Sequence, residues 1–97
     1  MAIRLPVELQ ARREPSPHIV RTLTQNISTG GLFIELDQED FSPGEMLDVS
    51  LTLPAGEGVS SYPTRARTRA EVLRVMPSDD RSHFGIAARF VERLRMG

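Results

Sequence analysis

Apolar and polar residues alternate along several short segments of this chain, which is the pattern of a β-strand with one buried face. The clearest segment is 46–53, where Leu47, Val49, Leu51 and Leu53 alternate with polar residues. Successive side chains of a strand point to opposite faces, so these four residues should share one face. The sequence therefore predicts a strand at 46–53 whose apolar face lies in the core.

Five further segments have strand-like patterns and are separated by Gly, Pro, Asn, Asp and Ser residues that are typical of turns. They are residues 5–10, 18–24, 32–36, 62–76 and 83–90. Residues 54–58 should stop the strand that ends at 53. No segment has a convincing helical period, so the pattern predicts an all-β barrel or sandwich. We expect residues 91–96 to form at most one short helical turn.

Two details of this pattern predict irregularities. Pro6 lacks a backbone donor, so its strand should lie at an edge of the sheet or begin near Pro6. Within 62–76, Arg65, Arg67 and Arg69 share one face, but the apolar residues that follow have the same parity. A bulge near Glu71 would restore the alternation.

The core of this sheet is predicted from the apolar positions of the strands. We expect the following side chains in it: Leu47, Val49, Leu51, Val72 and Phe90.

The segment between 18–24 and 32–36 is the most informative for function. It contains Asn26, Ser28 and the pair Gly30-Gly31, which together exceed what a plain hairpin turn requires. Glycine accepts positive φ and leaves the backbone N–H groups uncovered. Together with a hydroxyl and a carboxamide, these groups suit an anionic ligand or one rich in acceptors.

This segment resembles a known motif. Asn26-x-Ser28-x-x-Gly31 is similar to the (Asp/Asn)-x-Ser-x-x-Gly motif of PilZ domains, which are bacterial receptors for cyclic di-GMP. Arg4, just before the first strand, resembles the second arginine of the family's Arg-x-x-x-Arg motif, whose first arginine would precede Met1. Segments 47–54 and 84–90 are similar to the fourth and last strands of the family.

The resemblance implies a fold and a set of ligand contacts. It implies one PilZ-like domain over residues 1–97, built as a six-stranded antiparallel β-barrel with the C-terminal helix absent or reduced to a short turn. The residues expected to bind cyclic di-GMP are Arg4, Asn26, Ser28, Gly30 and Gly31. Possible accessory contacts are Arg12, Arg13, Arg65 and Arg67.

Arginines and glycines in these positions also have structural interpretations. The Asn26–Gly31 segment can act as a turn whose polar side chains bond only to the local backbone. The arginine stripe at 65–69 can be a solvated face that discourages edge pairing, or it can dock an acidic partner. Absence of the first motif arginine favours a second function, a degenerate PilZ-like adaptor that does not bind the nucleotide and acts through protein contacts.

Composition limits the remaining classes. The 97 residues carry a net charge of −1, and all twelve basic residues are arginine. An acidic balance disfavours DNA or RNA as partners. The chain has no cysteine and no long apolar run, which predicts a cytoplasmic protein without membrane insertion.

Catalytic and metal-binding functions are not indicated. His18 and His83 are the only histidines, and no nucleophile–base arrangement or phosphate-binding Gly-Lys-Ser/Thr loop is evident. We therefore predict no enzyme activity, no catalytic residue, no metal site and no cofactor. The expected partners are cyclic di-GMP and an unidentified protein.

Overall fold

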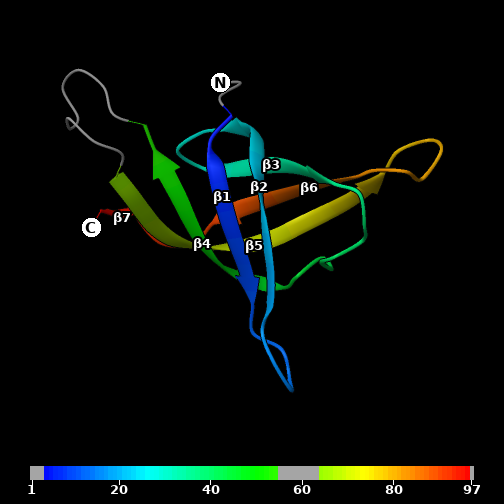
Figure 1. The fold of residues 1–97 in the computed structure, drawn as a ribbon, viewed down its shortest axis with the longest axis horizontal. Coiled ribbons are helices and arrows are strands. Elements are labelled where there is room, and N and C mark those ends of the chain that lie inside the picture. The colour runs from blue at the N-terminus through cyan, green and yellow to red at the C-terminus, as the bar shows by residue number, and fades with distance from the viewer. Residues whose placement is uncertain (1–3, 55–63, 97) are drawn as a thin grey trace.

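The computed structural model describes residues 4–54 and 64–96 of the protein. Its strands are β1 (Pro6–Ala11), β2 (His18–Ile27), β3 (Gly31–Leu36), β4 (Met46–Leu53), β5 (Thr64–Pro77), β6 (Phe84–Phe90) and β7 (Arg95–Met96). All neighbouring strands pair antiparallel, in the order β4-β1-β2-β3-β6-β5-β7. Strand β4 also pairs with β5, which closes β1 to β6 into the predicted six-stranded barrel (Figure 1). No helix occurs among the described residues.

The barrel interior contains the apolar face that the alternation predicts. Leu47, Val49, Leu51 and Val72 are buried, as expected, together with residues from β1, β3 and β6. Phe90 is only half-buried and packs against this cluster from its margin. It stands last in β6, where the barrel ends, and therefore cannot be enclosed on all sides.

Strand β2 is longer than predicted and contains the first residue of the motif. It continues to Ile27, so Asn26 belongs to the strand and not to the turn. The pairing with β3 shifts between Thr24 and Asn26, which leaves Gln25 as the extra residue of a bulge. Bulges bend a strand and redirect its side chains, and this one lies directly beside the motif.

The irregularities that the pattern predicted are confirmed. The bulge in β5 lies between Val72 and Arg74, two residues from Glu71. Strand β1 begins at Pro6, the second of the two expected positions, and lies between β2 and β4. Strand β4 ends before Pro54, while the rest of the predicted stop and the start of the 62–76 strand lie outside the described residues. One expectation needs correction, because residues 95–96 form strand β7 instead of a helical turn.

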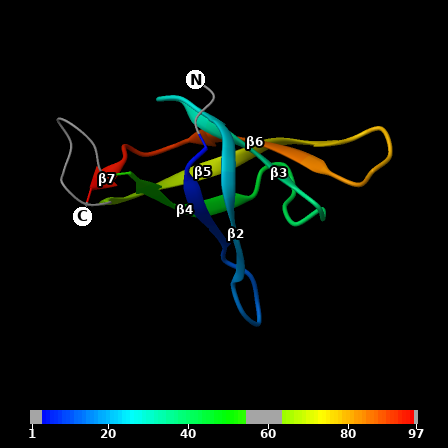
Figure 2. The same cartoon turned by 45° about the horizontal axis from the view of Figure 1, so that its top comes forward.

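The β1–β2 hairpin projects from the body of the barrel, and its connecting residues 12–17 form the tip (Figures 1 and 2). Only the second half of β2 pairs with β3, because β3 joins it at Thr24. The motif segment and the hairpin tip therefore lie at opposite ends of β2.

Candidate functional site

The N-terminal segment is held against β2 by a buried threonine. The backbone N–H of Leu5 donates to Thr24 Oγ1 at 2.9 Å, and the backbone N–H of Thr24 donates to the Leu5 carbonyl at 2.9 Å. This pair of bonds places Arg4 opposite the bulge. The Arg4 guanidinium donates to Gln25 Oε1 at 3.1 Å and is otherwise exposed.

The turn that follows β2 is organised by its own backbone. The Ser28 N–H donates to the Gly31 carbonyl at 2.9 Å, and the Gly30 N–H donates to Ser28 Oγ at 3.2 Å. The Ser28 hydroxyl proton is thereby left to donate outward. The Asn26 carboxamide is exposed and forms no hydrogen bond with any described residue.

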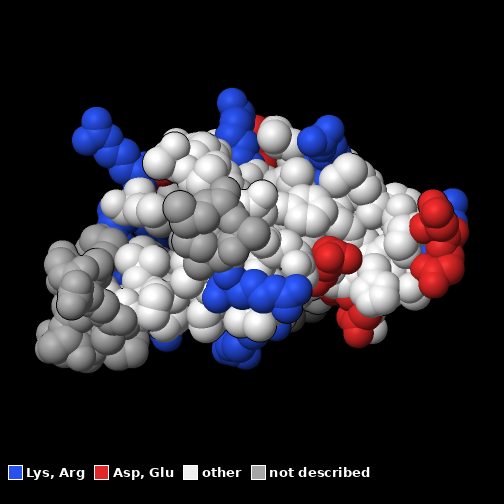
Figure 3. Space-filling model, turned by 90° about the horizontal axis from the view of Figure 1, so that it is seen from above, with Lys and Arg blue, Asp and Glu red and all other residues white. Residues whose placement is uncertain are grey.

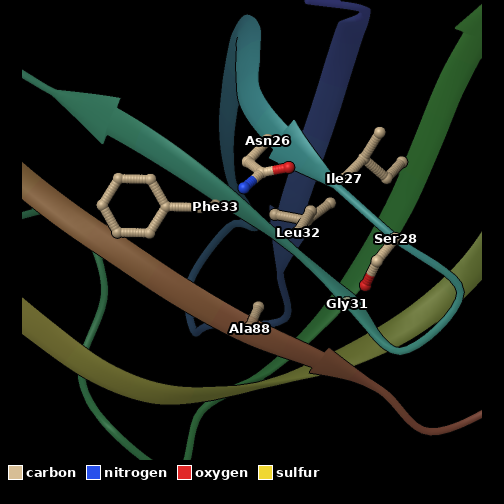
Figure 4. A pocket seen from close by; sticks show the side chains of 7 residues that line it. All are labelled: Asn26, Ile27, Ser28, Gly31, Leu32, Phe33 and Ala88. Atoms are coloured by element: carbon tan, nitrogen blue, oxygen red, sulfur yellow. The ribbon is translucent and has the colours of Figure 1, made fainter. Parts of the chain in front are cut away.

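These groups surround a shallow hollow of about 250 Å³. Its lining residues are Asn26, Ile27, Ser28, Gly31, Leu32, Phe33 and Ala88. Figure 4 shows Ser28 at one side of the hollow, the Phe33 ring at the other and Asn26 above them. The volume lies just below the usual range of small-molecule pockets, roughly 300–1,000 Å³. The hollow is therefore suited to one part of a ligand, with the remainder lying over the surface.

Gly31 is required by close approach and not by an unusual backbone angle. A Cβ atom at this position would collide with the backbone carbonyl of Ala88 on β6. Positive φ, the other reason for a glycine in a turn, does not apply here, because among the described glycines only Gly44 has one, at 87°. Gly31 therefore lets β3 lie directly on the end of β6.

Phe33 is a residue of the site that the sequence did not single out. It lies in register with Ala87 of β6, and its ring fills the space where a side chain at Gly85 would stand. The ring is half-buried, so part of it remains accessible beside Asn26. The Phe33 ring lies over Gly85 only in this register of β3 against β6. No local pattern in the sequence specifies that register.

Arg12 and Arg13 follow β1, at the end opposite to Arg4. About eight residues of extended chain separate Arg12 from Arg4, or roughly 26 Å at 3.3 Å per residue. Arg12 Nε lies 3.1 Å from Asp48 Oδ2. The structure does not bring these two arginines together with the motif.

Arg13 belongs to a group of contacts that we call the Arg13 network, comprising Arg13, His18, Asp40, Phe41 and Glu45. Arg13 donates to both carboxylate oxygens of Glu45 at 2.7 Å, and its Nη2 also donates to the Asp40 carbonyl at 2.7 Å. His18 Nε2 lies 2.8 Å from Asp40 Oδ1, and its ring meets the edge of buried Phe41. The bonds from Arg13 hold the pKa of Glu45 below its ordinary value of 4.5.

Arg65 and Arg67 lie on the outer face of β5, with Ala66 and Thr68 buried on the other side, as the alternation predicts. In the sheet, β6 and then β3 follow β5, so these arginines are separated from the motif turn. The segment after β6 continues alongside β5, where Arg95 stands opposite Arg67. The two arginines do not line the motif hollow.

The histidines lie in separate surroundings. His83 Nδ1 contacts the Ser82 hydroxyl at 2.8 Å, whereas His18 belongs to the Arg13 network. In the described part of the chain, no three His, Cys, Asp or Glu side chains gather in a way that could hold a metal ion. Residues 4–54 and 64–96 also contain no helix long and apolar enough to cross a membrane.

Comparison with known proteins agrees with this architecture. The family model described as PilZ domain matches residues 1–96. The solved structure of the Bacillus subtilis inhibitor of motility (MotI/DgrA) matches 96% of this chain with a TM-score of 0.76 and 26% sequence identity. This chain corresponds to only 41% of that protein. No curated protein sequence matches it.

Proposed function

Because this chain belongs to the PilZ domain family, a family of receptor and adaptor modules, we propose that it binds cyclic di-GMP and acts as a cytoplasmic signalling module in bacteria. The observation that carries the proposal is the hollow beside Asn26 and Ser28. Its polar groups point outward, and the Asn26 carboxamide has no protein partner among the described residues. The described part of the fold does not use these donors and acceptors, so they remain available to a ligand that occupies the hollow.

One guanine base would occupy this hollow. Asn26 can both donate to and accept from a guanine edge, and the Ser28 hydroxyl can donate to a base or phosphate oxygen. The accessible part of the Phe33 ring provides an apolar surface against the base. Gly31 contributes by keeping this part of the surface free of side-chain atoms.

Arg4 would bind the part of the nucleotide that lies outside the hollow. Its one contact with a neutral amide leaves most of its five N–H donors available. A guanidinium can pair two of them with one phosphate or with the N7 and O6 of guanine. Because Arg4 is exposed, the expected affinity is modest and decreases with salt.

Calorimetric titration with cyclic di-GMP tests the proposal. The variants Asn26→Ala and Gln38→Ala each remove one side-chain amide, so they form a matched pair. Gln38 is exposed, follows the end of β3 and does not line the hollow. We expect Asn26→Ala to weaken binding about fivefold or more, and Gln38→Ala to leave it unchanged.

Absence of heat from the folded wild-type protein at high nucleotide concentration would reject the receptor function. That result would favour the nucleotide-independent adaptor. Equal affinity of both amide variants would instead place the nucleotide elsewhere on the protein.

A further inference from the structure

The outer face of β5 carries positive charge that none of the described residues neutralises. Arg65 and Arg67 are exposed, and neither forms an ion pair or a side-chain hydrogen bond with a described residue. Within the described part of the chain, Arg95 on β7 pairs with Glu92 alone, at 3.6 Å, and its side chain is 72% exposed. We call these three residues the β5 arginine patch.

The acidic residues beside this patch are already paired with other arginines. Glu8 Oε1 lies 2.9 Å from Arg21 Nη2. Asp48 lies 3.1 Å from Arg12 Nε and 3.6 Å from Arg69 Nε. These two carboxylates therefore offset their own partners and leave the patch with a local excess of positive charge.

The patch also borders a hollow of about 340 Å³ in the outer surface. The hollow is lined by Glu8, Gln10, Asp48, Val49, Ser50, Arg65, Arg67, Thr68 and Arg95. Arginines thus stand at one side of it, while Ser50 and Gln10 provide neutral polar groups on the other strands. The surface is concave and hydrogen-bonding, and not only charged.

The spacing of the arginines is regular because they belong to paired strands. Arg65 and Arg67 are alternate residues of β5, so their Cα atoms are about 6.6 Å apart. Arg67 lies directly opposite Arg95 in the β5–β7 pair, at a Cα separation of roughly 5 Å. Like charges placed directly opposite destabilise a sheet unless an anion compensates them.

We propose that the β5 arginine patch docks an extended acidic segment of a partner protein, with carboxylates at alternate positions. Alternate side chains of an extended peptide have the same spacing as Arg65 and Arg67, so two carboxylates can meet two guanidinium groups at once. This proposal is independent of nucleotide binding, because the patch and the motif hollow share no residue.

The surrounding charges favour an acidic peptide over a nucleic acid. Glu8 and Asp48 line the same hollow, so a continuous phosphate backbone would have to pass over their carboxylates, whereas a peptide can place neutral residues there. On the face shown in Figure 3, most acidic side chains lie toward the right-hand end, where the β5–β6 turn is, and most basic side chains lie over the middle and left.

The test is fluorescence anisotropy with a labelled peptide of alternating glutamate and threonine, about eight residues long. A glutamine–threonine peptide is the control. The wild-type protein should bind only the acidic peptide. The R65Q/R67Q double variant should weaken binding about fivefold at low salt. The R74Q/R81Q double variant removes the same charge from two exposed arginines elsewhere and should leave binding unchanged.

Several results would overturn the proposal. Binding that is absent in the folded wild-type protein, or lost equally in both double variants, would mean that the patch does not dock an acidic segment. Stronger binding of a single-stranded oligonucleotide than of the acidic peptide would identify a nucleic acid as the occupant.

A second copy of the chain is the remaining occupant, because it would offer Glu35, Asp37 and Glu39, which are exposed acids close together in the sequence. Sedimentation distinguishes this case. A salt-sensitive dimer that is lost in R65Q/R67Q would show that the patch binds a second copy of the chain and not a partner protein.

Discussion

The two ends of strand β1 carry arginines in contrasting surroundings. Beyond its C-terminal end, Arg13 donates three hydrogen bonds, to Glu45 and to the Asp40 carbonyl, and lies against the buried Phe41 ring. Before its N-terminal end, Arg4 donates one bond to a neutral amide. Both were candidate ligand contacts by sequence, yet Arg13 uses three of its five N–H donors within the protein, whereas Arg4 is seen to use one.

This difference separates a structural arginine from one that can bind a ligand. The Arg13 network ties the projecting β1–β2 hairpin to the loop between β3 and β4, and its charge is met by Glu45 within the protein. At the other end, Asn26 and Ser28 present polar groups to solvent around a hollow, and Arg4 is exposed beside Gln25. Removing side chains should therefore affect stability at the first end and ligand affinity at the second.

The largest expected effect tests the close approach of β3 and β6 on which the motif end depends. Gly31→Val should destabilise the domain by at least about 3 kcal/mol, because the new side chain must displace the Ala88 carbonyl. That corresponds to a loss of more than about 10 °C in melting temperature. Thr29→Val in the same turn is the control and should change stability by less than about 0.5 kcal/mol, since Thr29 is exposed.

Equal melting temperatures of these two variants, measured by circular dichroism, would show that β3 and β6 can separate at this point without cost. The motif would then be a flexible turn, and the contrast between the two ends would lose its structural basis.

The next effect concerns affinity alone. Arg4→Ala should weaken cyclic di-GMP binding by at least about tenfold, equivalent to 1.4 kcal/mol, because a charge-assisted pair is lost. It should leave the melting temperature almost unchanged, since Arg4 has a single exposed contact. Arg74→Ala removes an exposed arginine from β5 and is the matched control. Tight binding that does not depend on Arg4 would mean that other arginines hold the nucleotide.

At the C-terminal end of β1, a substitution in the Arg13 network should change the free energy of unfolding, and this change should depend on pH. Glu45→Gln should lower the free energy of unfolding by about 1 kcal/mol at neutral pH, a value reduced by the partial exposure of Arg13. The folded pKa of Glu45 lies below 4.5, so its contribution is present above that pH and is lost as the pH falls through the folded pKa.

The difference in melting temperature between wild type and Glu45→Gln should therefore shrink below about pH 4.5. Glu39→Gln is a suitable control, because Glu39 is exposed and forms no ion pair with a described residue. A difference that stays constant down to pH 3 would mean that the charge of Glu45 contributes nothing.

The smallest effect refines the assignment of the motif. Ser28→Ala should weaken cyclic di-GMP binding about three- to fivefold, because a neutral hydroxyl bond contributes about 1 kcal/mol. Calorimetry at low salt should resolve it. A loss larger than that of Arg4→Ala would show that the hollow, and not the arginine, dominates recognition.

Sequence reasoning was most successful where the determining contacts are local. The alternation at 46–53 and at Arg65–Arg69 gave the correct faces, because strand geometry alone assigns them. The requirement for glycine at position 31 could also be predicted, from the turn residues around it and from the motif. The cause of that requirement could not be predicted, because the obstructing atom belongs to Ala88, in another strand.

The missed features all depend on pairing between distant segments. The bulge at Gln25, whose side chain accepts the bond from Arg4, follows from the β2–β3 register. The roles of Arg13 and His18 depend on the loop between β3 and β4, which no periodicity connects with the β1–β2 hairpin. The assignments of Arg4, Asn26, Ser28, Gly30 and Gly31 as nucleotide contacts remain predictions.

One backbone bond of the motif turn makes its motion measurable without any substitution. The Phe90 N–H donates to the Gly30 carbonyl at 2.9 Å, so its proton can exchange with solvent only when the turn separates from the end of β6. The exchange rate of this single amide therefore reports how often the turn opens. A nucleotide held in the hollow would slow this exchange, whereas a segment docked on β5 alone would leave it unchanged.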